Sequence, residues 1–374
     1  MVKAVYIHIP FCSYKCSYCD FTSLVDSPIP PSDYLNLLLK EARLYRNVES
    51  SIRTIYMGGG TPTLLKPEEI GRLLEGLSSI FELSSLEEVS VECNPETYRY
   101  AEFKRLTSYG VNRLSIGAQS FTLKGLSALG RRHTPEDTLK AFSEARDAGF
   151  ESINLDLIYG YPGQRPEDVE SELEVIERLR PEHISAYLLT PYEGTPMGLA
   201  ILSGRLKQPR EEELAEIYDR LWKGLRALGY ERYEISNWSL PGKECRHNLV
   251  YWKGEEFLGL GLSAWGYFGR VRYGNTKVLK SYGEAVLSNK RPVAKEVRLS
   301  GRDVFEEDLM LRLRLKWGLE LSERHLIPEH LMDFFEERDN FIGIKEEYML
   351  LSNEIITEVL LYNSDRNTLE VKNG

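Results

Sequence analysis

The sequence has little cysteine and no long hydrophobic run. Five cysteines among 374 residues are too few for the disulfide framework of a secreted protein. No apolar stretch approaches the roughly 18 residues of a membrane-spanning helix, and the N-terminus lacks the basic and then apolar pattern of a signal peptide. Low-complexity tracts are absent, as are repeats that sequence identity would reveal. These absences predict a soluble, cytoplasmic protein without a transmembrane segment.

Positive charge is in the minority. The chain has 47 lysines and arginines against 57 aspartates and glutamates, a formal net charge of −10 at pH 7. This balance argues against non-specific binding to nucleic acid or anionic membranes, so we expect no nucleic-acid partner. Hydrophobic residues at 42% and charged residues at 28% are ordinary for a globular protein. The length suits one large domain and a small one.

Strand-like apolar runs alternate with helix-like segments along the first half of the chain. The runs begin at residues 4, 54, 88, 113, 153 and 183. Several helix-like segments start with proline and acidic residues, and two end at Gly110 and Gly149, which is typical of helix termini. Six such β/α alternations predict parallel strands with right-handed crossovers, and therefore a TIM-like or open α/β sheet.

Chemically distinctive residues follow these predicted strands. The stretch GGGTP (residues 58–62) comes after the second strand, Glu92 ends the third, Gln119 follows the fourth and Asp156 lies in the fifth. Three cysteines follow the first strand. Because the C-terminal ends of parallel strands share one rim, where active sites form, we expect these features to meet at one site.

The character of the chain changes after about residue 295. We predict a barrel domain over residues 1–230, an extension of it over 231–294 and a small C-terminal domain over 295–374. In the last, residues 306–327 and 328–340 look helical, and 341–362 reads as a short hairpin with a final helix. This pattern resembles a winged-helix-like α+β unit. Its acidic balance disfavours DNA binding and favours a lid or docking role.

The stretch YIHIPFCSYKCSYCDF places Cys12, Cys16 and Cys19 in eight residues with no fourth cysteine nearby. Buried core thiols fit poorly with the polar spacers between them. Structural zinc sites usually take four ligands, and a thioredoxin-like redox pair needs only two cysteines. The remaining interpretation is an iron–sulfur cluster with three cysteine ligands and one iron open to an exchangeable ligand.

The spacing Cys-x3-Cys-x2-Cys after a first strand resembles the radical S-adenosylmethionine (SAM) family. That resemblance implies a partial (β/α)6 TIM-like barrel and a 4Fe–4S cluster whose open iron is chelated by SAM. In the family one electron from the cluster cleaves SAM to a 5′-deoxyadenosyl radical. The motifs YIHIPFC, GGGTPT, IGAQSF, LGRRHT and NLDLIYGYP are similar to the coproporphyrinogen-oxidase-like branch across about residues 1–270.

Two subgroups of this branch differ at a few positions. The oxygen-independent coproporphyrinogen III oxidases carry a further cysteine where this chain has Phe21. The HemW-type haem chaperones share the residue type at that position and a downstream His-Asn-x-x-Tyr-Trp motif, here HNLVYW from His247 to Trp252. The chain also begins almost directly at the first strand. It therefore most resembles the haem chaperones. One departure is Trp265, where the family often has histidine.

The resemblance implies a haem chaperone that holds a SAM-ligated cluster, binds haem and delivers it to an acceptor protein, with an electron donor as a further partner. The alternative is the oxygen-independent oxidative decarboxylase of coproporphyrinogen III. The missing fourth cysteine and the HNLVYW motif favour the first. Cleavage of SAM is compatible with both, whereas coproporphyrinogen oxidation is not expected of the chaperone.

The resemblance also assigns residues to the cofactors. Cys12, Cys16 and Cys19 are the expected cluster ligands. Expected SAM contacts, each of which could instead be an ordinary interior or loop residue, are Tyr6, Gly59, Gly60, Thr61, Glu92, Gln119, Arg131, Asp156 and Thr190. Glycines permit close backbone approach, carboxylates suit an ammonium or ribose hydroxyls, and Arg131 suits a carboxylate. Strand alternation predicts that Cys93 is structural and that His8 is a satisfied core histidine.

For haem, His247 is the expected iron ligand, with Cys245 as the fallback and Trp265 as a possible ring contact. Imidazole is a common axial ligand of haem iron, and aromatic side chains can cover a porphyrin face. The alternative is that His247 and Asn248 are polar loop residues, while Tyr251 and Trp252 anchor the loop to the core.

Overall fold

Six parallel strands form the centre of the protein. The computed structural model describes residues 1–373, with side chains described for residues 1–364. Each strand pairs in parallel with the next: β1 (Val2–Ile9), β2 (Ser50–Gly59), β3 (Glu88–Cys93), β4 (Arg113–Gln119), β5 (Ser152–Tyr159) and β6 (His183–Leu188). The six predicted strand-like runs are confirmed, and their starts differ from the observed ones by at most four residues.

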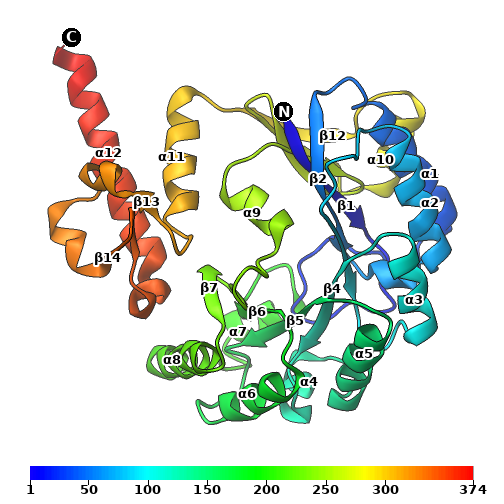
Figure 1. Ribbon diagram of the computed structural model, residues 1–374, viewed down its shortest axis with the longest axis horizontal. Helices are drawn as coiled ribbons and strands as arrows, with labels where there is room; N and C mark the ends of the chain where they lie inside the picture. Colours follow the sequence, from blue (N-terminus) through cyan, green and yellow to red (C-terminus); the bar gives the residue numbers. More distant parts are fainter. Residues whose placement is uncertain (374) are drawn as a thin grey trace.

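Helices connect these strands and arch around their outer side (Figure 1). They are α1 (Pro31–Arg43), α2 (Pro67–Ser78), α3 (Tyr100–Ser108), α4 (Leu123–Leu129), α5 (Pro135–Asp147) and α6 (Asp168–Leu179). Each turns an apolar stripe toward the sheet. In α2, for example, Ile70, Leu73 and Leu77 are buried at the spacing of one helix face. None of the described helices is both long and apolar enough to cross a membrane.

The sheet is an open barrel. Its strand order is β12-β11-β10-β9-β1-β2-β3-β4-β5-β6-β8-β7. In the described residues, β6 pairs in parallel with β5 and antiparallel with β8, whereas β9 (Phe257–Leu260) pairs in parallel with β1. Because β6 and β9 are not paired with each other, the ring of strands is incomplete. This confirms the predicted partial barrel.

Residues after β6 extend the same sheet at both edges. One edge carries β7 (Glu231–Glu234) and β8 (Asn237–Ser239), which follow helices α7 (Pro196–Leu202) and α8 (Glu211–Ala227). The other carries β9, β10 (Trp265–Phe268), β11 (Val271–Asn275) and β12 (Val293–Arg298), with helix α10 (Leu279–Leu287) between the last two. Helix α9 (Arg246–Trp252) connects the two edges. The domain boundaries at residues 230 and 294 stay a prediction.

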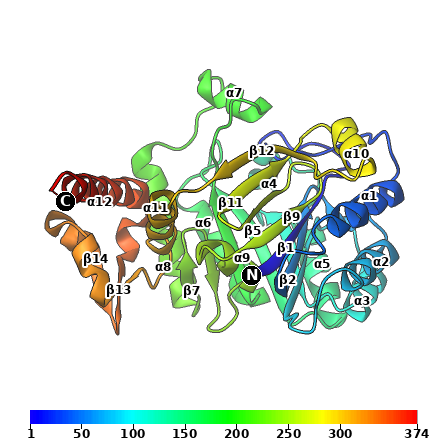
Figure 2. The same ribbon diagram turned by 90° about the horizontal axis from the view of Figure 1, so that it is seen from above.

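The C-terminal part is a small α+β unit beside the open barrel (Figures 1 and 2). Helix α11 (Gly301–Arg312) leads into a three-stranded antiparallel sheet in the order β13-β15-β14, and helix α12 (Ser352–Asn373) ends the described chain. Its strands are β13 (Leu319–Glu320), β14 (Phe335–Arg338) and β15 (Phe341–Ile344). Short 3-10 helices follow at η2 (Leu321–Leu326), η3 (Glu329–Phe334) and η4 (Glu346–Leu351), and another, η1 (Pro62–Leu64), follows β2.

Two predicted helices in this unit are wrong in part. The segment predicted over residues 306–327 is α-helical only to Arg312 and continues with β13 and the 3-10 helix η2, and the one over 328–340 becomes η3 and then strand β14. These differences arise from tertiary packing. Gly318 adopts a positive φ of 64° and packs so closely under β15 that a Cβ there would lie 2.1 Å from the carbonyl oxygen of Ile342. The predicted final helix is confirmed, but the hairpin predicted within residues 341–362 is wrong in its bounds, because only β15 lies there and its partner β14 ends at Arg338.

An ion pair ties this unit to the barrel. The Arg232 Nε on β7 lies 2.8 Å and 2.7 Å from the two carboxylate oxygens of Glu346 in η4, and the Tyr218 hydroxyl donates to the same carboxylate over 3.2 Å. The backbone N–H of Lys316 also donates to the carbonyl oxygen of Tyr233 over 3.0 Å. The C-terminal unit is therefore held beside the strand ends of β6 to β8.

Candidate cofactor cavity

One cavity of about 680 Å³ opens at the C-terminal ends of the parallel strands. Its lining includes eleven of the thirteen residues predicted for the cofactors: Cys12, Cys16, Cys19, Gly59, Gly60, Thr61, Glu92, Gln119, Arg131, Asp156 and Thr190. These residues come from seven separate stretches of sequence. The expectation that the strand-end residues share one rim is therefore confirmed.

The three cysteines lie in the loop between β1 and α1, and each is partly exposed. The backbone N–H of Cys12 donates to the Leu24 carbonyl over 3.0 Å, and that of Cys19 donates to the Cys16 carbonyl over 3.2 Å. Burial raises the pKa values of Cys12 and Cys19, and the charge of Cys16 adds to both effects. All three cysteines line the same cavity.

This arrangement fits a cluster better than a single ion. Across the described chain, no three Cys, His, Asp or Glu side chains converge closely enough to hold one metal ion. In a cubane cluster each thiolate binds a different iron, so the sulfurs stand farther apart than the ligands of one ion. Three cysteines that line one cavity supply the three thiolates that such a cluster takes.

The GGGTP loop meets the cavity with its backbone. The N–H of Gly59 donates to Glu92 Oε2 over 2.9 Å, and those of Gly60 and Thr61 donate to the carbonyls of Ile9 and Phe11 over 2.8 Å and 2.7 Å. Since all three N–H groups have acceptors, any backbone groups of these residues that bind a ligand must be carbonyl oxygens. These accept from an ammonium and do not suit a carboxylate, which narrows the role expected for this loop.

Glycine is required at two of these positions. Gly59 has φ of 104°, a conformation that side chains disfavour, and a Cβ there would lie 2.3 Å from the His8 ring. A Cβ on Gly58 would lie 2.6 Å from Glu92 Oε1. The loop therefore packs directly on the side chains beneath it.

Two carboxylates face the cavity from β3 and β5. Glu92 accepts from the Tyr56 hydroxyl over 3.0 Å as well as from Gly59, while Asp156 accepts from Ser115 Oγ over 2.8 Å and from Asn154 Nδ2 over 2.9 Å. Burial, reinforced by the charge of Asp156, raises the pKa of Glu92 to about 7. Burial also raises the pKa of Asp156. The pair is thus ready to bind a positively charged or hydroxyl-rich ligand.

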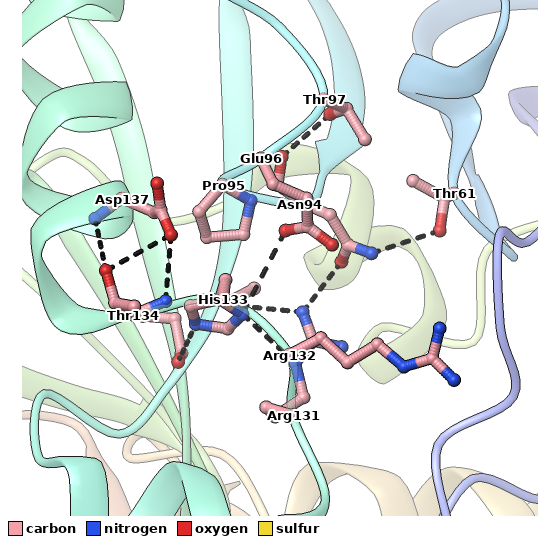
Figure 3. A network of polar contacts seen from close by, with 12 residues as sticks. Thr61, Asn94, Pro95, Glu96, Thr97, Arg131, Arg132, His133, Thr134 and Asp137 are labelled. Atoms are coloured by element: carbon pink, nitrogen blue, oxygen red, sulfur yellow. Dashed lines mark hydrogen bonds and ion pairs between the residues drawn. The ribbon is translucent and has the colours of Figure 1, made fainter.

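Arg131 links the strand ends to the cysteine loop. Its guanidinium donates to Cys16 Sγ over 3.3 Å. It also donates to Asn94 Oδ1 over 3.0 Å, and the Asn94 amide donates to Thr61 Oγ1 over 3.3 Å (Figure 3). The adjacent Arg132 instead stacks on the Tyr14 ring, 4.4 Å from its centroid. Arg131 is therefore the arginine of the cavity, as predicted.

Gln119 and Thr190 lie at the rim. Gln119 ends β4 with φ of 64°, a left-handed conformation unusual for a residue other than glycine, and the β4–β5 pairing shifts register there. Such local strain is often found at functional sites. Thr190 is exposed, and its hydroxyl donates to the Leu188 carbonyl over 3.4 Å.

Tyr6 lies below the cavity and does not line it. Its hydroxyl lies 3.1 Å from His8 Nδ1, and His8 Nε2 lies 2.7 Å from the Thr22 carbonyl. His8 is therefore the satisfied core histidine that alternation predicted. Tyr6 supports the loop after β1 from within the barrel. Direct contact between Tyr6 and SAM stays a prediction.

His247 also lies outside the cavity, in α9. Its imidazole is 1% exposed, with Nδ1 2.8 Å from Thr54 Oγ1 and Nε2 2.6 Å from the Tyr251 hydroxyl. Burial lowers its pKa to about 3. Both ring nitrogens are occupied, so His247 can bind haem iron only if its ring leaves these partners. Its role as haem ligand stays a prediction.

The other residues weighed for haem differ in exposure. Cys245 is buried, and its thiol donates to Glu88 Oε1 over 3.5 Å. Burial raises the pKa of this thiol to about 12, which disfavours a thiolate ligand. Cys93 is buried in the core and contacts Asn94 and Thr97, as a structural cysteine would. Trp265 is 42% exposed on β10.

Sequence reasoning missed several lining residues. Asn94 and Ser115 are polar and stand next to predicted positions, so the NP turn after Glu92 was a usable signal. Apart from Tyr159, which belongs to the NLDLIYGYP motif, the apolar wall carries no motif: Tyr187, Leu188, Tyr192, Tyr218, Ile235, Met349 and Leu350. Met349 and Leu350 belong to the C-terminal unit, which no local pattern places at the barrel mouth.

Known proteins resemble this chain along most of its length. The Radical SAM superfamily profile matches residues 6–176. The heme chaperone HemW of Lactococcus lactis is 36% identical over 99% of this chain and 93% of its own, and that of Bacillus subtilis is 34% identical over 95% and 98%.

A solved structure has the same fold. The coproporphyrinogen III oxidase HemN of Escherichia coli, a radical SAM enzyme, superposes with a TM-score of 0.82 at 24% sequence identity over 96% of this chain and 90% of its own. At this identity the likeness concerns the fold. With the HemW relatives, the profile match and the cysteine loop together, this chain belongs to the HemW family of radical SAM proteins.

Proposed function

We propose that this protein is a haem chaperone that holds a 4Fe–4S cluster and SAM in the cavity and transfers haem to an acceptor protein. Family membership supports this function. The single structural observation that carries it is the cavity, which unites three cysteines and two carboxylates with an apolar wall. A cytoplasmic location, a protein that accepts haem and a protein that donates electrons belong to the same proposal.

Cys12, Cys16 and Cys19 would hold the cluster, which when bound supplies an electron to SAM at the open iron. Arg131 holds the loop through Cys16 and offsets the negative charge of thiolate ligands. Because the thiol pKa values of Cys12 and Cys19 are raised by burial, cluster assembly must displace protons from them.

The SAM pocket would use hydrogen-bond acceptors for the ammonium and the ribose hydroxyls, and the donor Arg131 for the carboxylate. Carbonyl oxygens of the GGGTP loop and the carboxylate of Glu92 suit the ammonium of the methionine part, and Asp156 suits the ribose hydroxyls. Glu92 becomes fully ionised only above its raised pKa of about 7, so a nearby ammonium favours its charged form. Arg131 lies on the same wall and suits the methionine carboxylate.

Haem would lie against the apolar wall. Large hydrophobic side chains are unusually exposed around the cavity, including Phe21 at 60%, Tyr187 at 44% and Leu350 at 38%. Exposed apolar side chains that gather on one surface mark a binding site, and a flat tetrapyrrole would cover them. Phe21 stands where the oxidases carry their additional cysteine, so the chain offers an apolar ring at that place.

One preparation tests the proposal. Protein reconstituted anaerobically with iron and sulfide is titrated with SAM and with haem, and haem transfer is followed to apomyoglobin. We expect stoichiometric binding of each and a Soret band that moves to the globin. The same preparation is incubated with coproporphyrinogen III, SAM and dithionite. Decarboxylated product would contradict the chaperone function and favour the oxidase.

A further inference from the structure

The HNLVYW helix is joined to the cofactor cavity through the barrel interior, although its side chains do not line that cavity. Helix α9 is fixed at its start, where the backbone N–H groups of Arg246 and His247 donate to Glu88 over 3.1 Å and 2.9 Å. Glu88 is the first residue of β3, whereas Glu92 faces the cavity from near its end. The helix therefore lies at the base of the strands that carry the site.

A chain of hydrogen bonds runs from this helix to Asp156. Asn248 Nδ2 donates to the Tyr233 hydroxyl over 3.2 Å, and that hydroxyl lies 2.9 Å from His183 Nε2. His183 Nδ1 lies 2.7 Å from Asn154 Oδ1, and Asn154 Nδ2 lies 2.9 Å from Asp156 Oδ1. Tyr233, His183 and Asn154 are all buried, so water does not compete with these contacts.

The donors and acceptors available on each side chain allow only one direction of donation along these hydrogen bonds. The carboxylate of Asp156 accepts, so the Asn154 amide points its nitrogen there and its oxygen toward His183. That oxygen also only accepts, so His183 carries its proton on Nδ1. Burial pushes the pKa of His183 well below its ordinary value and keeps the ring neutral, which leaves Nε2 as an acceptor for Tyr233. Every link thus donates toward Asp156.

A second contact path connects the same helix to Glu92. The His247 ring stacks on Tyr56, with ring centroids 5.2 Å apart and an interplanar angle of 30°. The Tyr56 hydroxyl donates to Glu92 Oε1 over 3.0 Å. Adjacent residues of one helix therefore support both cavity carboxylates by separate routes.

We propose that Asn248 and His247 are positioning residues that hold Asp156 and Glu92 in the geometry of the cofactor cavity, Asn248 through Tyr233, His183 and Asn154, and His247 through Tyr56. The expected ligand effect rests on the proposed SAM pocket, whereas the positioning of Asp156 does not. Tyr233 and His183 acquire a role that no motif assigned to them.

The test uses Tyr233→Phe in the full chain, because it removes one oxygen from the middle of the Asn248 path and nothing from the cavity. Tyr230→Phe is the matched control, since Tyr230 is buried nearby and its hydroxyl donates only to the Pro181 carbonyl in the described contacts, over 2.6 Å. Asn248→Ala, at a partly exposed position, is the second variant should Tyr233→Phe fail to fold.

Two readouts are taken. In protein with ¹³C-labelled aspartate carboxyls, and with the Asp156 signal assigned through Asp156→Asn, the Asp156 titration midpoint should move to higher pH in Tyr233→Phe and stay in place in Tyr230→Phe. A weakened donor stabilises the ionised carboxylate less, which gives this sign. In cluster-reconstituted protein, SAM affinity should fall about three- to tenfold, the equivalent of one hydrogen bond.

The outcomes separate the two proposals. If the Asp156 titration midpoint moves in Tyr233→Phe but the reconstituted protein binds no SAM, the positioning role is upheld and the SAM pocket is overturned. Equal Asp156 titrations in Tyr233→Phe and Tyr230→Phe, with equal SAM affinities, overturn the positioning role and leave the pocket standing. Asn248→Ala should shift the Asp156 titration midpoint in the same direction as Tyr233→Phe but by less. A shift in the opposite direction would also overturn the positioning role.

Discussion

The guanidinium of Arg131 donates to Sγ of Cys16 over 3.3 Å, although 115 positions separate the two residues in the sequence. Through Asn94 the same arginine reaches Thr61, which lies 3.7 Å from Cys12 Sγ. The tips of β2 and β3 and the loop after α4 therefore hold the cysteine loop in its working position. Preorganisation of this kind lowers the cost of assembling a cluster there.

Replacing Cys12, Cys16 or Cys19 by alanine should abolish the cluster. Three thiolates are the fewest that hold a cubane with one iron open, so each loss is severe. Iron and sulfide content and the near-ultraviolet absorbance of anaerobically reconstituted protein measure this. Cys93→Ala and Cys245→Ala are the controls and should retain the cluster, because both thiols are buried and have partners outside the loop, Cys93 at Asn94 and Thr97 and Cys245 at Glu88. Wild-type iron content in Cys16→Ala would refute the assignment.

Glu92→Ala and Asp156→Ala should each weaken SAM binding by about 1.5–3 kcal/mol, the contribution of a charge-assisted hydrogen bond. Arg131→Ala should act likewise through the methionine carboxylate. Isothermal titration of reconstituted protein under anaerobic conditions gives the affinities. Asp168→Ala, which removes a carboxylate that pairs with Lys124 on the surface, should leave them unchanged. Unaltered affinity in all three cavity variants would mean that SAM is held by other residues.

In the protein without SAM, the contribution of Glu92 to stability should fall as pH rises from about 4.5 to 7. The pKa of Glu92 is raised from 4.5 to about 7, so in this window the folded state holds a proton that the unfolded state has released. The stabilising contribution is complete below pH 4.5 and is lost through pH 7. The thermal unfolding temperature measured across this range should fall less with rising pH in Glu92→Gln, relative to wild type.

Glu41→Gln supplies the comparison, because burial raises the pKa of Glu41 to about 7 as well, far from the cavity. It should flatten the same profile without changing SAM affinity. A Glu92→Gln profile parallel to that of wild type would contradict the raised pKa of Glu92.

If His247 binds haem iron, His247→Ala should shift the Soret band and weaken haem binding by at least about tenfold, since an axial ligand is lost. Anaerobic haem titration with absorption spectra measures both. Cys245→Ala is the matched comparison from the same helix start and should bind haem as wild type does. A spectrum identical to wild type in His247→Ala would place the iron ligand elsewhere.

Arg232→Ala should destabilise the protein by about 3 kcal/mol, because it leaves Glu346 without its partner at a buried contact. The Arg232 side chain is 2% exposed. Urea unfolding measures the loss, and Arg210→Ala, which breaks the exposed pair with Glu213, should cost less than about 1 kcal/mol. Equal effects of the two variants would show that the C-terminal unit is not held by this ion pair.

Local patterns in the sequence were sufficient to predict the strands of the barrel. Strands β3 and β4 begin at the predicted residues 88 and 113, because apolar residues alternate with polar ones along both strands and the helices that cover their apolar face begin with recognisable caps. The cysteine spacing and the polar residues at strand ends were equally readable. Functional side chains at the C-terminal ends of parallel strands meet at one rim, and this does not depend on the identity of the other side chains in the sheet.

Contacts between distant segments decided the rest. The sequence predicted a helix where Leu319 and Glu320 pair with β15, since a two-residue strand has too few residues to show a period and depends on its partner. It also presented His247 as an open ligand, yet Thr54, 193 positions away, and Tyr251 occupy both ring nitrogens. Composition and spacing thus determined the fold and the cluster loop. Tertiary structure decided which polar groups face the cavity and which form hydrogen bonds inside the protein that support it.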